Sequence, residues 1–368
     1  MTIYYVLLGV SVLGGFGLCT FWKNRWAKLS YVGAMGVIFT VLAGIRFLTG
    51  YDYASYWPIF TESYGLDWFD LSDSLIRFER GYLMVNKTIA NFTVEAPAIF
   101  FFFGAVYAVS VMWFIYRYSS NPWMSVAAFL CFGLFFNSFC FMRQYTATVI
   151  LMWALIDIKE NRPMRFVTLV LLASTFHLSA LIFLPFYLIL KIPLNRVVIP
   201  FAVIGGILFY AFSDDFYVLA ARLYYQREVS SPESLGVLPW PSLGFVALLI
   251  VCLLWRGELV KLNSFNSILI NCLFFGTYFE LMGIKYHIVS RIAVLFMTPA
   301  IVLLISDLAK VFTTAAQETK YGKRYPYIAQ ALVYVLLLLL MTGYYAYLIH
   351  VNYNGVVPYR TISELYQY

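Results

Sequence analysis

Charged side chains are scarce in this sequence. They make up 12% of its 368 residues, while 62% of the residues are hydrophobic; an ordinary soluble domain carries about 25% charged residues. Apolar runs of roughly the 20 residues needed to cross the hydrocarbon of a bilayer recur from end to end. The composition therefore excludes a soluble enzyme and predicts an all-α, polytopic membrane protein.

Motifs for metal ions and redox chemistry are also missing. The five cysteines include no C-x-x-C pair. No D-x-D sequence, which would hold a metal-bound diphosphate, occurs, and Asp214 and Asp215 are adjacent rather than spaced. We therefore expect no metal and no cofactor. The net charge of +7 is explained by lysine and arginine in cytoplasmic loops, so nucleic acid is not an expected partner.

About twelve helical segments are predicted from the apolar runs, within one integral membrane domain that spans residues 1–368. Three of these runs, 144–158, 197–212 and 241–255, are short for a full crossing. The remaining runs lie at 2–21, 30–48, 97–117, 123–141, 166–190, 265–283, 290–309 and 327–348.

Basic loops predict the orientation of these segments, because short cytoplasmic loops are enriched in lysine and arginine. The loop 22–28, WKNRWAK, is then cytoplasmic, and the long segment 49–95 is on the outer side. Residues 166–190 allow two interpretations. If they form a single span, three later basic loops lie outside, against this enrichment of basic residues on the cytoplasmic side. If they form two short helices that turn near His177, all three loops lie inside. We prefer this hairpin, since short arms are tolerated where protein surrounds them.

Most of the unusual polar residues fall on the outer face in this scheme. Within the first outer loop, residues 72–90 have the spacing of an amphipathic helix, with Arg77, Arg80 and Lys87 away from its apolar side. Such a helix would lie on the membrane surface near anionic headgroups. The other outer segments are 137–144, the turn at His177, the second long loop 213–240, 283–291 and 350–368. This asymmetry predicts a site that faces the periplasm or the extracellular space.

Three arginines stand at the outer ends of apolar runs: Arg46, Arg143 and Arg291. An arginine in such a place is often an interface anchor whose stem lies along apolar surface. The positive-inside rule nevertheless predicts few arginines at outer ends. A guanidinium group binds phosphate oxygens through a rigid fork of donors. Three such groups around one outward cavity would suit a diphosphate.

Three further side chains could accept a proton, because Asp, Glu and His are the usual general bases. Asp52 follows Arg46 closely and could equally be a solvated loop carboxylate or a partner of that arginine. Glu79 lies in the predicted amphipathic helix, where it could also be a surface charge. His177 stands in an apolar run, where a lone histidine is often a hydrogen-bonded core residue, although ionisable groups at membrane depth are functional candidates.

These residues form an ordered set of short motifs that resembles the EpsG-like branch of the Wzy polysaccharide polymerases of bacteria. The first motif is an arginine followed by G-x-D-x-x-x-Y. The later motifs, in chain order, are E-x-G-aromatic-L, Arg-Gln, FHLSAL, RIAVLF and Pro-Tyr. The positions are Arg46, Gly50, Asp52, Tyr56, Glu79, Gly81, Tyr82, Leu83, Arg143, Gln144, 176–181, 291–296, Pro358 and Tyr359. Each motif is weak alone, but the set covers nearly the whole chain. One departure is Arg80, where many relatives carry proline.

The resemblance implies a glycosyltransferase of the GT-C type in the bacterial inner membrane, with its active site on the periplasmic side. Donor and acceptor would be oligosaccharide repeat units carried on undecaprenyl diphosphate. The growing glycan would move to the non-reducing end of an incoming lipid-linked repeat, to make O-antigen, capsule or exopolysaccharide. Membrane lipid and a chain-length regulator protein would be further partners.

Roles for individual residues follow from the resemblance. The diphosphate would be bound by Arg46, Arg143, Arg291 and Arg80. The sugar path would be lined by Tyr56, Gln144 and Tyr359. We favour Asp52 as the base that accepts the proton of the acceptor hydroxyl, because Arg46 would hold it ionised. His177 comes next, and Glu79 third.

Two other functions remain open. A flippase or exporter of lipid-linked oligosaccharide would need no base, but an alternating-access carrier has polar groups near the midplane and repeat symmetry, and we find no internal repeat. A membrane O-acyltransferase would need a histidine-based site and a path for an acyl donor from the cytoplasm.

Overall fold

Helices dominate the computed structural model, which describes residues 1–22, 24–68, 78–214 and 240–367. The described residues contain no β-strand. Five of their helices are long and apolar enough to cross a membrane, which confirms a helical, polytopic membrane protein. These helices are α1 with its π-helical end (Thr2–Thr20), α2 (Arg25–Ile45), α6 (Pro97–Tyr118), α17 (His287–Glu318) and α19 (Pro326–His350).

The chain divides into two compact units. The first combines Met1–Leu184 with Ile301–Tyr368, and the second is Pro185–Ala300. Shorter helices of the first unit are α3 (Tyr53–Gly65), α5 (Arg80–Ala90), α7 (Pro122–Cys131), α8 (Leu134–Asn137), α9 (Met142–Lys159), α10 (Pro163–Ser174), η2 (Leu178–Phe183), α18 (Lys320–Arg324), η3 (Tyr353–Gly355) and η4 (Ile362–Gln367). Helices of the second unit are α11 (Phe186–Ile189), α12 (Val198–Ala211), α14 (Trp240–Leu254), α15 (Arg256–Leu262) and α16 (Asn266–Met282).

Within the second unit, α14 packs against α16. A bend of 75° separates Ser242–Leu254 from Arg256–Leu262, so the two form one broken span or a re-entrant loop. Most of the loop predicted at 213–240 lies outside the described residues. The count of about twelve segments and the GT-C likeness stay predictions.

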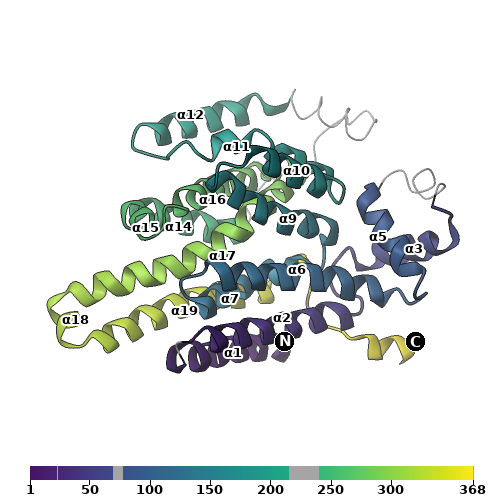
Figure 1. Ribbon diagram of the computed structural model, residues 1–368, viewed down its shortest axis with the longest axis horizontal. Coiled ribbons are helices and arrows are strands. Elements are labelled where there is room, and N and C mark those ends of the chain that lie inside the picture. The colour runs from purple at the N-terminus through teal and green to yellow at the C-terminus, as the bar shows by residue number, and fades with distance from the viewer. Residues whose placement is uncertain (23, 69–77, 215–239, 368) are drawn as a thin grey trace. The chain divides into compact units, whose positions relative to one another are not determined.

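In the first unit, α2 and α6 lie side by side (Figure 1). A Cβ on Gly104 would lie 2.5 Å from the Cβ of Ala43. The two helices therefore touch where both carry small side chains, a common basis of close packing in membranes. Beyond one end of this pair, α3 and α5 pack together (Figure 1). Their buried aromatic residues, Tyr53 and Tyr82 among them, form one core with Phe100 of α6.

The C-terminal tail packs beside the segment that follows α2. The N–H of Phe47 donates to the carbonyl of Arg360 at 2.9 Å, and the N–H of Gly50 donates to the carbonyl of Gly355 at 3.0 Å. The start of the segment 49–95 and the tail, which we predicted to share the outer face, are therefore neighbours.

The chain reverses direction at His177. α10 ends at Ser174, His177 is extended, and η2 then runs back along α10. The rings of Phe166 and Phe183 are 6.5 Å apart, whereas a straight helix would separate these two positions by about 25 Å. The preferred interpretation of residues 166–190, a turn rather than a single span, is confirmed.

Two other sequence interpretations were wrong. Residues 123–141 were expected to form one span, but α7 ends at Cys131 and Gly133 adopts a left-handed conformation (φ 71°) that breaks the helix. In the helix predicted at 72–90, Lys87 was expected to face headgroups. It is instead buried within the α3–α5 core, where its ammonium donates to the carbonyl of Tyr64 at 3.2 Å. The part of that helix before Phe78 lies outside the described residues.

Candidate functional site

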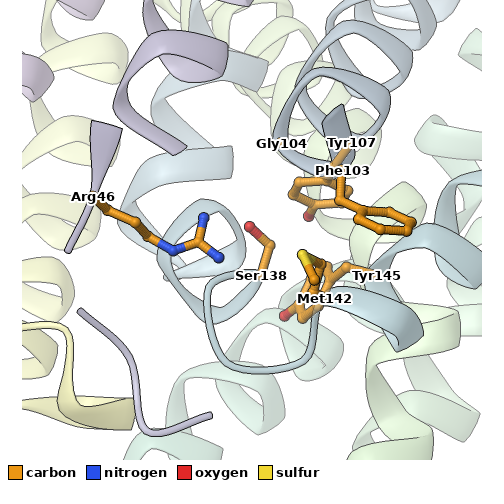
Figure 2. A pocket seen from close by; sticks show the side chains of 7 residues that line it. All are labelled: Arg46, Phe103, Gly104, Tyr107, Ser138, Met142 and Tyr145. Atoms are coloured by element: carbon orange, nitrogen blue, oxygen red, sulfur yellow. The ribbon is translucent and has the colours of Figure 1, made fainter. Parts of the chain in front are cut away.

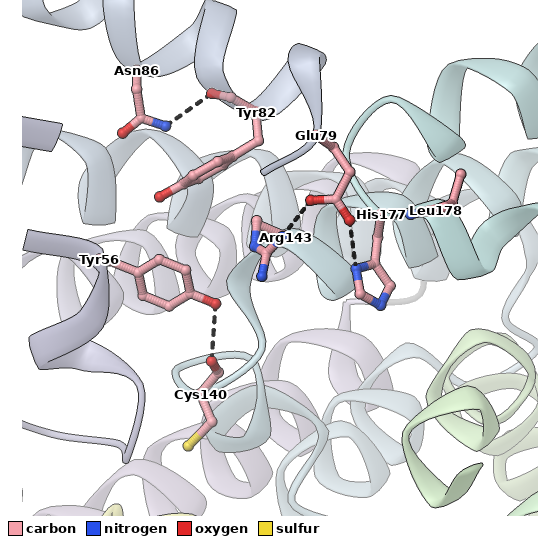
Figure 3. Close-up of polar contacts among 8 residues, drawn as sticks. All are labelled: Tyr56, Glu79, Tyr82, Asn86, Cys140, Arg143, His177 and Leu178. Atoms are coloured by element: carbon pink, nitrogen blue, oxygen red, sulfur yellow. Dashed lines mark hydrogen bonds and ion pairs between the residues drawn. The ribbon is translucent and has the colours of Figure 1, made fainter. Parts of the chain in front are cut away.

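One carboxylate joins an arginine and a histidine in the first unit (Figure 3). Oε2 of Glu79 accepts a hydrogen bond from Nη1 of Arg143. Oε1 lies 3.2 Å from Nδ1 of His177 and also accepts a hydrogen bond from the N–H of Leu178 at 3.2 Å. Three motifs that are far apart in the sequence therefore meet at one side chain.

This cluster, Glu79–Arg143–His177, is sheltered but can be reached. The side chains of Arg143, Glu79 and His177 are 23%, 12% and 20% exposed. Charges in such partly desolvated surroundings interact more strongly than in water. The three groups can thus contact a ligand while their charges are only weakly screened.

The start of α5 brings Glu79 to this position. Glu79 is extended and immediately precedes the helix, and the N–H of Gly81 donates to the carbonyl of Thr175 at 2.9 Å. A Cβ on Gly81 would lie 2.4 Å from Oγ1 of Thr175 and 2.7 Å from its carbonyl oxygen. A residue with a side chain cannot approach the turn before His177 so closely. The Glu-x-Gly spacing therefore has a steric basis.

Gly81→Ala is expected to separate α5 from this turn and to lower both stability and activity. Overpacking of this kind costs about 1–3 kcal/mol, and Glu79 would move away from His177. Thermal unfolding of the purified protein measures the first effect. Gly65→Ala is the matched control, since an added Cβ there meets no atom within 4 Å. Equal melting temperatures for the two variants would contradict the steric assignment.

Arg143 lies on the first turn of α9, among aromatic rings. Its Cζ is 5.0 Å from the ring centroid of Phe78 and 5.7 Å from that of Tyr82, distances at which a guanidinium is attracted by a ring face. The contact with Glu79 uses Nη1, and a guanidinium has five N–H donors. Arg143 therefore has donors left for an anionic ligand.

The charges of the cluster keep Glu79 ionised. Burial raises the pKa of its carboxyl group, but hydrogen bonding with His177 and the positive charge of Arg143 outweigh burial and lower the pKa to about 2. A carboxylate with so low a pKa is a weak base. Its chemical use is to orient and polarise its two partners.

Acid should weaken the fold through this carboxylate. Because folding lowers the pKa of Glu79 from 4.5 to about 2, its stabilising contribution is complete above pH 4.5 and is lost as the pH falls toward 2. The difference in melting temperature between wild type and Glu79→Gln should shrink as the pH falls below about 4.5. A difference that does not change with pH would contradict this assignment.

Arg46 has a different environment. The residue is 2% exposed, and Nη1 donates to the carbonyl of Ala43 at 2.7 Å. Its guanidinium lies over two aromatic rings, with Cζ 4.7 Å from the ring centroid of Phe100 and 4.4 Å from that of Phe139. The cavity beside it, which Ser138 also lines (Figure 2), measures about 10 Å³ and has room for about one water molecule. The diphosphate contact predicted for Arg46 does not fit a cavity of this size.

Arg46 instead helps to hold the turn that carries Arg143. Nη2 of Arg46 lies 3.5 Å from the carbonyl of Phe139, and the hydroxyl of Tyr56 donates to the carbonyl of Cys140 at 3.1 Å (Figure 3). Both carbonyls belong to the segment just before α9. Arg46 and Tyr56, both from the first motif, thus contact the backbone that positions Arg143 in the cluster.

The remaining candidate residues are placed as follows. Asp52, the base favoured from the sequence, is half-buried at the start of α3. Arg80 is exposed on the first turn of α5, and Gln144 is buried in α9. Tyr359 is half-buried, and its hydroxyl donates to the carbonyl of Leu42 at 2.6 Å. The substrate-binding roles of Arg80, Gln144, Tyr56 and Tyr359 stay predictions.

Arg291 is exposed on α17, in the second unit. Its predicted contact with a diphosphate also stays a prediction.

Sequence reasoning missed Phe78 and Thr175 as parts of the site. Phe78 immediately precedes the Glu-x-Gly motif, and its aromatic type is the only signal that the sequence offers; nothing in the sequence marks Thr175.

Comparison with known proteins identifies the family. The sequence profile of the EpsG family matches residues 30–361. The match covers every motif described above, from Arg46 to Tyr359, and all three members of the cluster. No curated protein and no solved structure matches the chain. The chain belongs to the EpsG family, which indicates a glycosyltransferase-like role in polysaccharide polymerisation by a multi-pass membrane protein.

Proposed function

We propose that this EpsG-family chain polymerises oligosaccharide repeat units carried on undecaprenyl diphosphate. The observation that carries the proposal is the Glu79–Arg143–His177 cluster, in which one carboxylate holds a guanidinium and an imidazole. Glycosyl transfer from a lipid diphosphate needs a cation for the leaving group and a base for the acceptor hydroxyl. Both kinds of group are present in the cluster.

Arg143 is the proposed diphosphate ligand. The bond between the anomeric carbon of the donor and the diphosphate oxygen breaks, and negative charge develops on that oxygen. A prepositioned guanidinium stabilises such charge most strongly where water is largely excluded. Glu79 and the rings of Phe78 and Tyr82 fix the guanidinium before the substrate arrives.

His177 is the proposed base. Glu79 faces its Nδ1, an arrangement that fixes the orientation and the tautomer of an imidazole. Nε2 then accepts the proton of the acceptor hydroxyl, whose oxygen bonds to the anomeric carbon. Undecaprenyl diphosphate leaves, and the glycan is longer by one repeat unit. This assignment moves the base from Asp52, which was favoured from the sequence, to the second candidate.

The proposed site faces the periplasm from the inner membrane. The basic loop 22–28 is cytoplasmic by the positive-inside rule, and α2 is long enough to cross the bilayer once. The segment after α2 is then periplasmic, together with the turn before Arg143 that it helps to hold.

A reconstituted reaction tests this function. Purified protein in lipid nanodiscs is supplied with a synthetic undecaprenyl-diphosphate-linked repeat, and the products are separated by size. We expect a ladder of glycans together with released undecaprenyl diphosphate, which forms roughly 10²–10⁴-fold more slowly in His177→Gln and at nearly the wild-type rate in Asp52→Asn. Loss of the ladder in Asp52→Asn alone would return the role of the base to Asp52.

The same preparation in sealed vesicles separates polymerisation from transport. A ladder formed without movement of the lipid-linked repeat across the bilayer supports the polymerase. Movement across the bilayer without a ladder would instead identify a flippase and would overturn the proposal.

A further inference from the structure

An apolar groove of about 350 Å³ lies between α2 and α6. Its volume falls within the range of small-molecule sites, roughly 300–1,000 Å³. Nearly every side chain that lines it is apolar, and Gly33 and Gly36 form part of its wall on α2. A Cβ on Gly33 would meet no atom within 4 Å. The groove is thus hollow because glycines stand where larger residues would fit.

Basic residues gather at one end of the groove. Leu29 and Tyr116 line that end, and each is next to a basic residue, Lys28 on α2 and Arg117 on α6. The ammonium of Lys28 lies 5.5 Å from the ring centroid of Tyr116. Arg25 and Arg117 are exposed, and Arg25 is one turn before Lys28. An anionic group would be attracted to this end.

Two tryptophans indicate that the basic end of the groove lies at the depth of the lipid headgroups. Trp22 and Trp26 are each 66% exposed, and Arg25 lies 5.3 Å from the ring centroid of Trp26. Exposed tryptophans of membrane proteins are enriched at the interface between hydrocarbon and water. The groove therefore begins at the headgroups and runs into the hydrocarbon.

The length of the groove matches one leaflet. Its residues on α2 extend from Leu29 to Val41, about 18 Å of helix, and half of the hydrocarbon core is about 15 Å thick. We propose that the groove binds an acyl chain of an anionic phospholipid of the cytoplasmic leaflet, whose headgroup contacts Arg25, Lys28 and Arg117. The proposal does not rest on the glycosyltransferase chemistry.

A second copy of the chain fits the groove less well. Symmetric association of two chains through one face would bring the same basic end of each copy together, and like charges repel. The lipid-linked substrate would carry its diphosphate at Arg143, in the turn region beyond the other end of α2, rather than at Lys28. The charge pattern therefore favours a phospholipid whose headgroup lies on the cytoplasmic side.

Photocrosslinking tests this proposal. The full-length protein is placed in nanodiscs of phosphatidylcholine with a trace of phosphatidylglycerol that carries a photoreactive acyl chain, and labelled peptides are mapped. We expect label at 29–41 and 105–116, displaced by unlabelled phosphatidylglycerol but not by added phosphatidylcholine. In the Lys28→Gln and Arg25→Gln variants, the amount of unlabelled phosphatidylglycerol needed to displace the label should rise roughly fivefold each.

Gly33→Leu should abolish the label by filling the groove, and Val37→Trp provides a second variant with the same purpose. Gly14→Leu is the matched control, because an added Cβ on this exposed glycine of α1 also meets no atom within 4 Å. Equal competition by both phospholipids would show annular lipid only and would overturn the proposal. Label that persists in both groove-filling variants, or crosslinks between two chains through the groove, would also overturn it.

Discussion

Glu79→Gln should lower kcat/KM for glycan polymerisation by roughly 10²–10⁴-fold, the usual contribution of a positioned acid–base system. Glutamine keeps the size of the side chain but removes the charge that holds Arg143 and faces Nδ1 of His177. The imidazole then loses the group that fixes its tautomer, and the guanidinium loses its ion pair. Initial rates with the synthetic lipid-linked repeat measure the effect.

Glu62→Gln is the matched control for this substitution. Glu62 is exposed on α3, so the same chemical change there should leave the rate within about twofold of wild type, as is usual for surface substitutions. Wild-type turnover by a folded Glu79→Gln protein would remove Glu79 from the reaction and would leave the ion pair a structural role only.

Arg143→Lys should lower kcat by roughly 10²–10³-fold, the loss that follows removal of one electrostatic donor to a transition state. Lysine retains the positive charge but not the planar fork that binds two phosphate oxygens. It also loses the contacts over the rings of Phe78 and Tyr82. Rates measured at saturating substrate separate this effect from weaker binding.

Arg162→Lys is a suitable comparison for Arg143→Lys. Arg162 also forms an ion pair with a glutamate, Glu160, at 2.8 Å, but its side chain is 54% exposed and it lies away from the cluster. Its replacement should leave turnover unchanged. If Arg143→Lys is as active as Arg162→Lys at equal expression, Arg143 does not bind the leaving group.

The turn at His177 could be predicted from the sequence because charge is a strong constraint in membranes. A single span through residues 166–190 would have placed three basic loops on the wrong side. Length alone also allowed a single span, since about 20 residues cross the hydrocarbon of a bilayer. The 6.5 Å contact of Phe166 with Phe183 shows that the charge argument was the better guide.

The difference between Arg46 and Arg143 could not be predicted. Both follow the same pattern, an arginine at the end of an apolar run, yet Arg46 is buried and Arg143 is only half-buried. Exposure depends on rings contributed by distant segments, Phe100 and Phe139 around Arg46. Local sequence carries no record of such long-range packing.

The grouping of the cluster was also beyond the sequence. Glu79 and Arg143 are separated by 64 residues, and each was only one of several candidates. Their motifs marked them as important but did not pair them. The approach of Glu79 to His177 depends on the close contact of Gly81 with Thr175, a steric feature that becomes visible only in three dimensions.

A double-mutant cycle on Glu79 and His177 tests the central claim most directly. The kcat/KM of polymerisation is measured for Glu79→Gln, His177→Gln and the double variant. If Glu79 acts largely through His177, the loss in the double variant should be much smaller than the product of the two single losses, because residues that act as a unit are strongly non-additive. A loss in the double variant equal to the product of the two single losses would show independent action and would contradict the account.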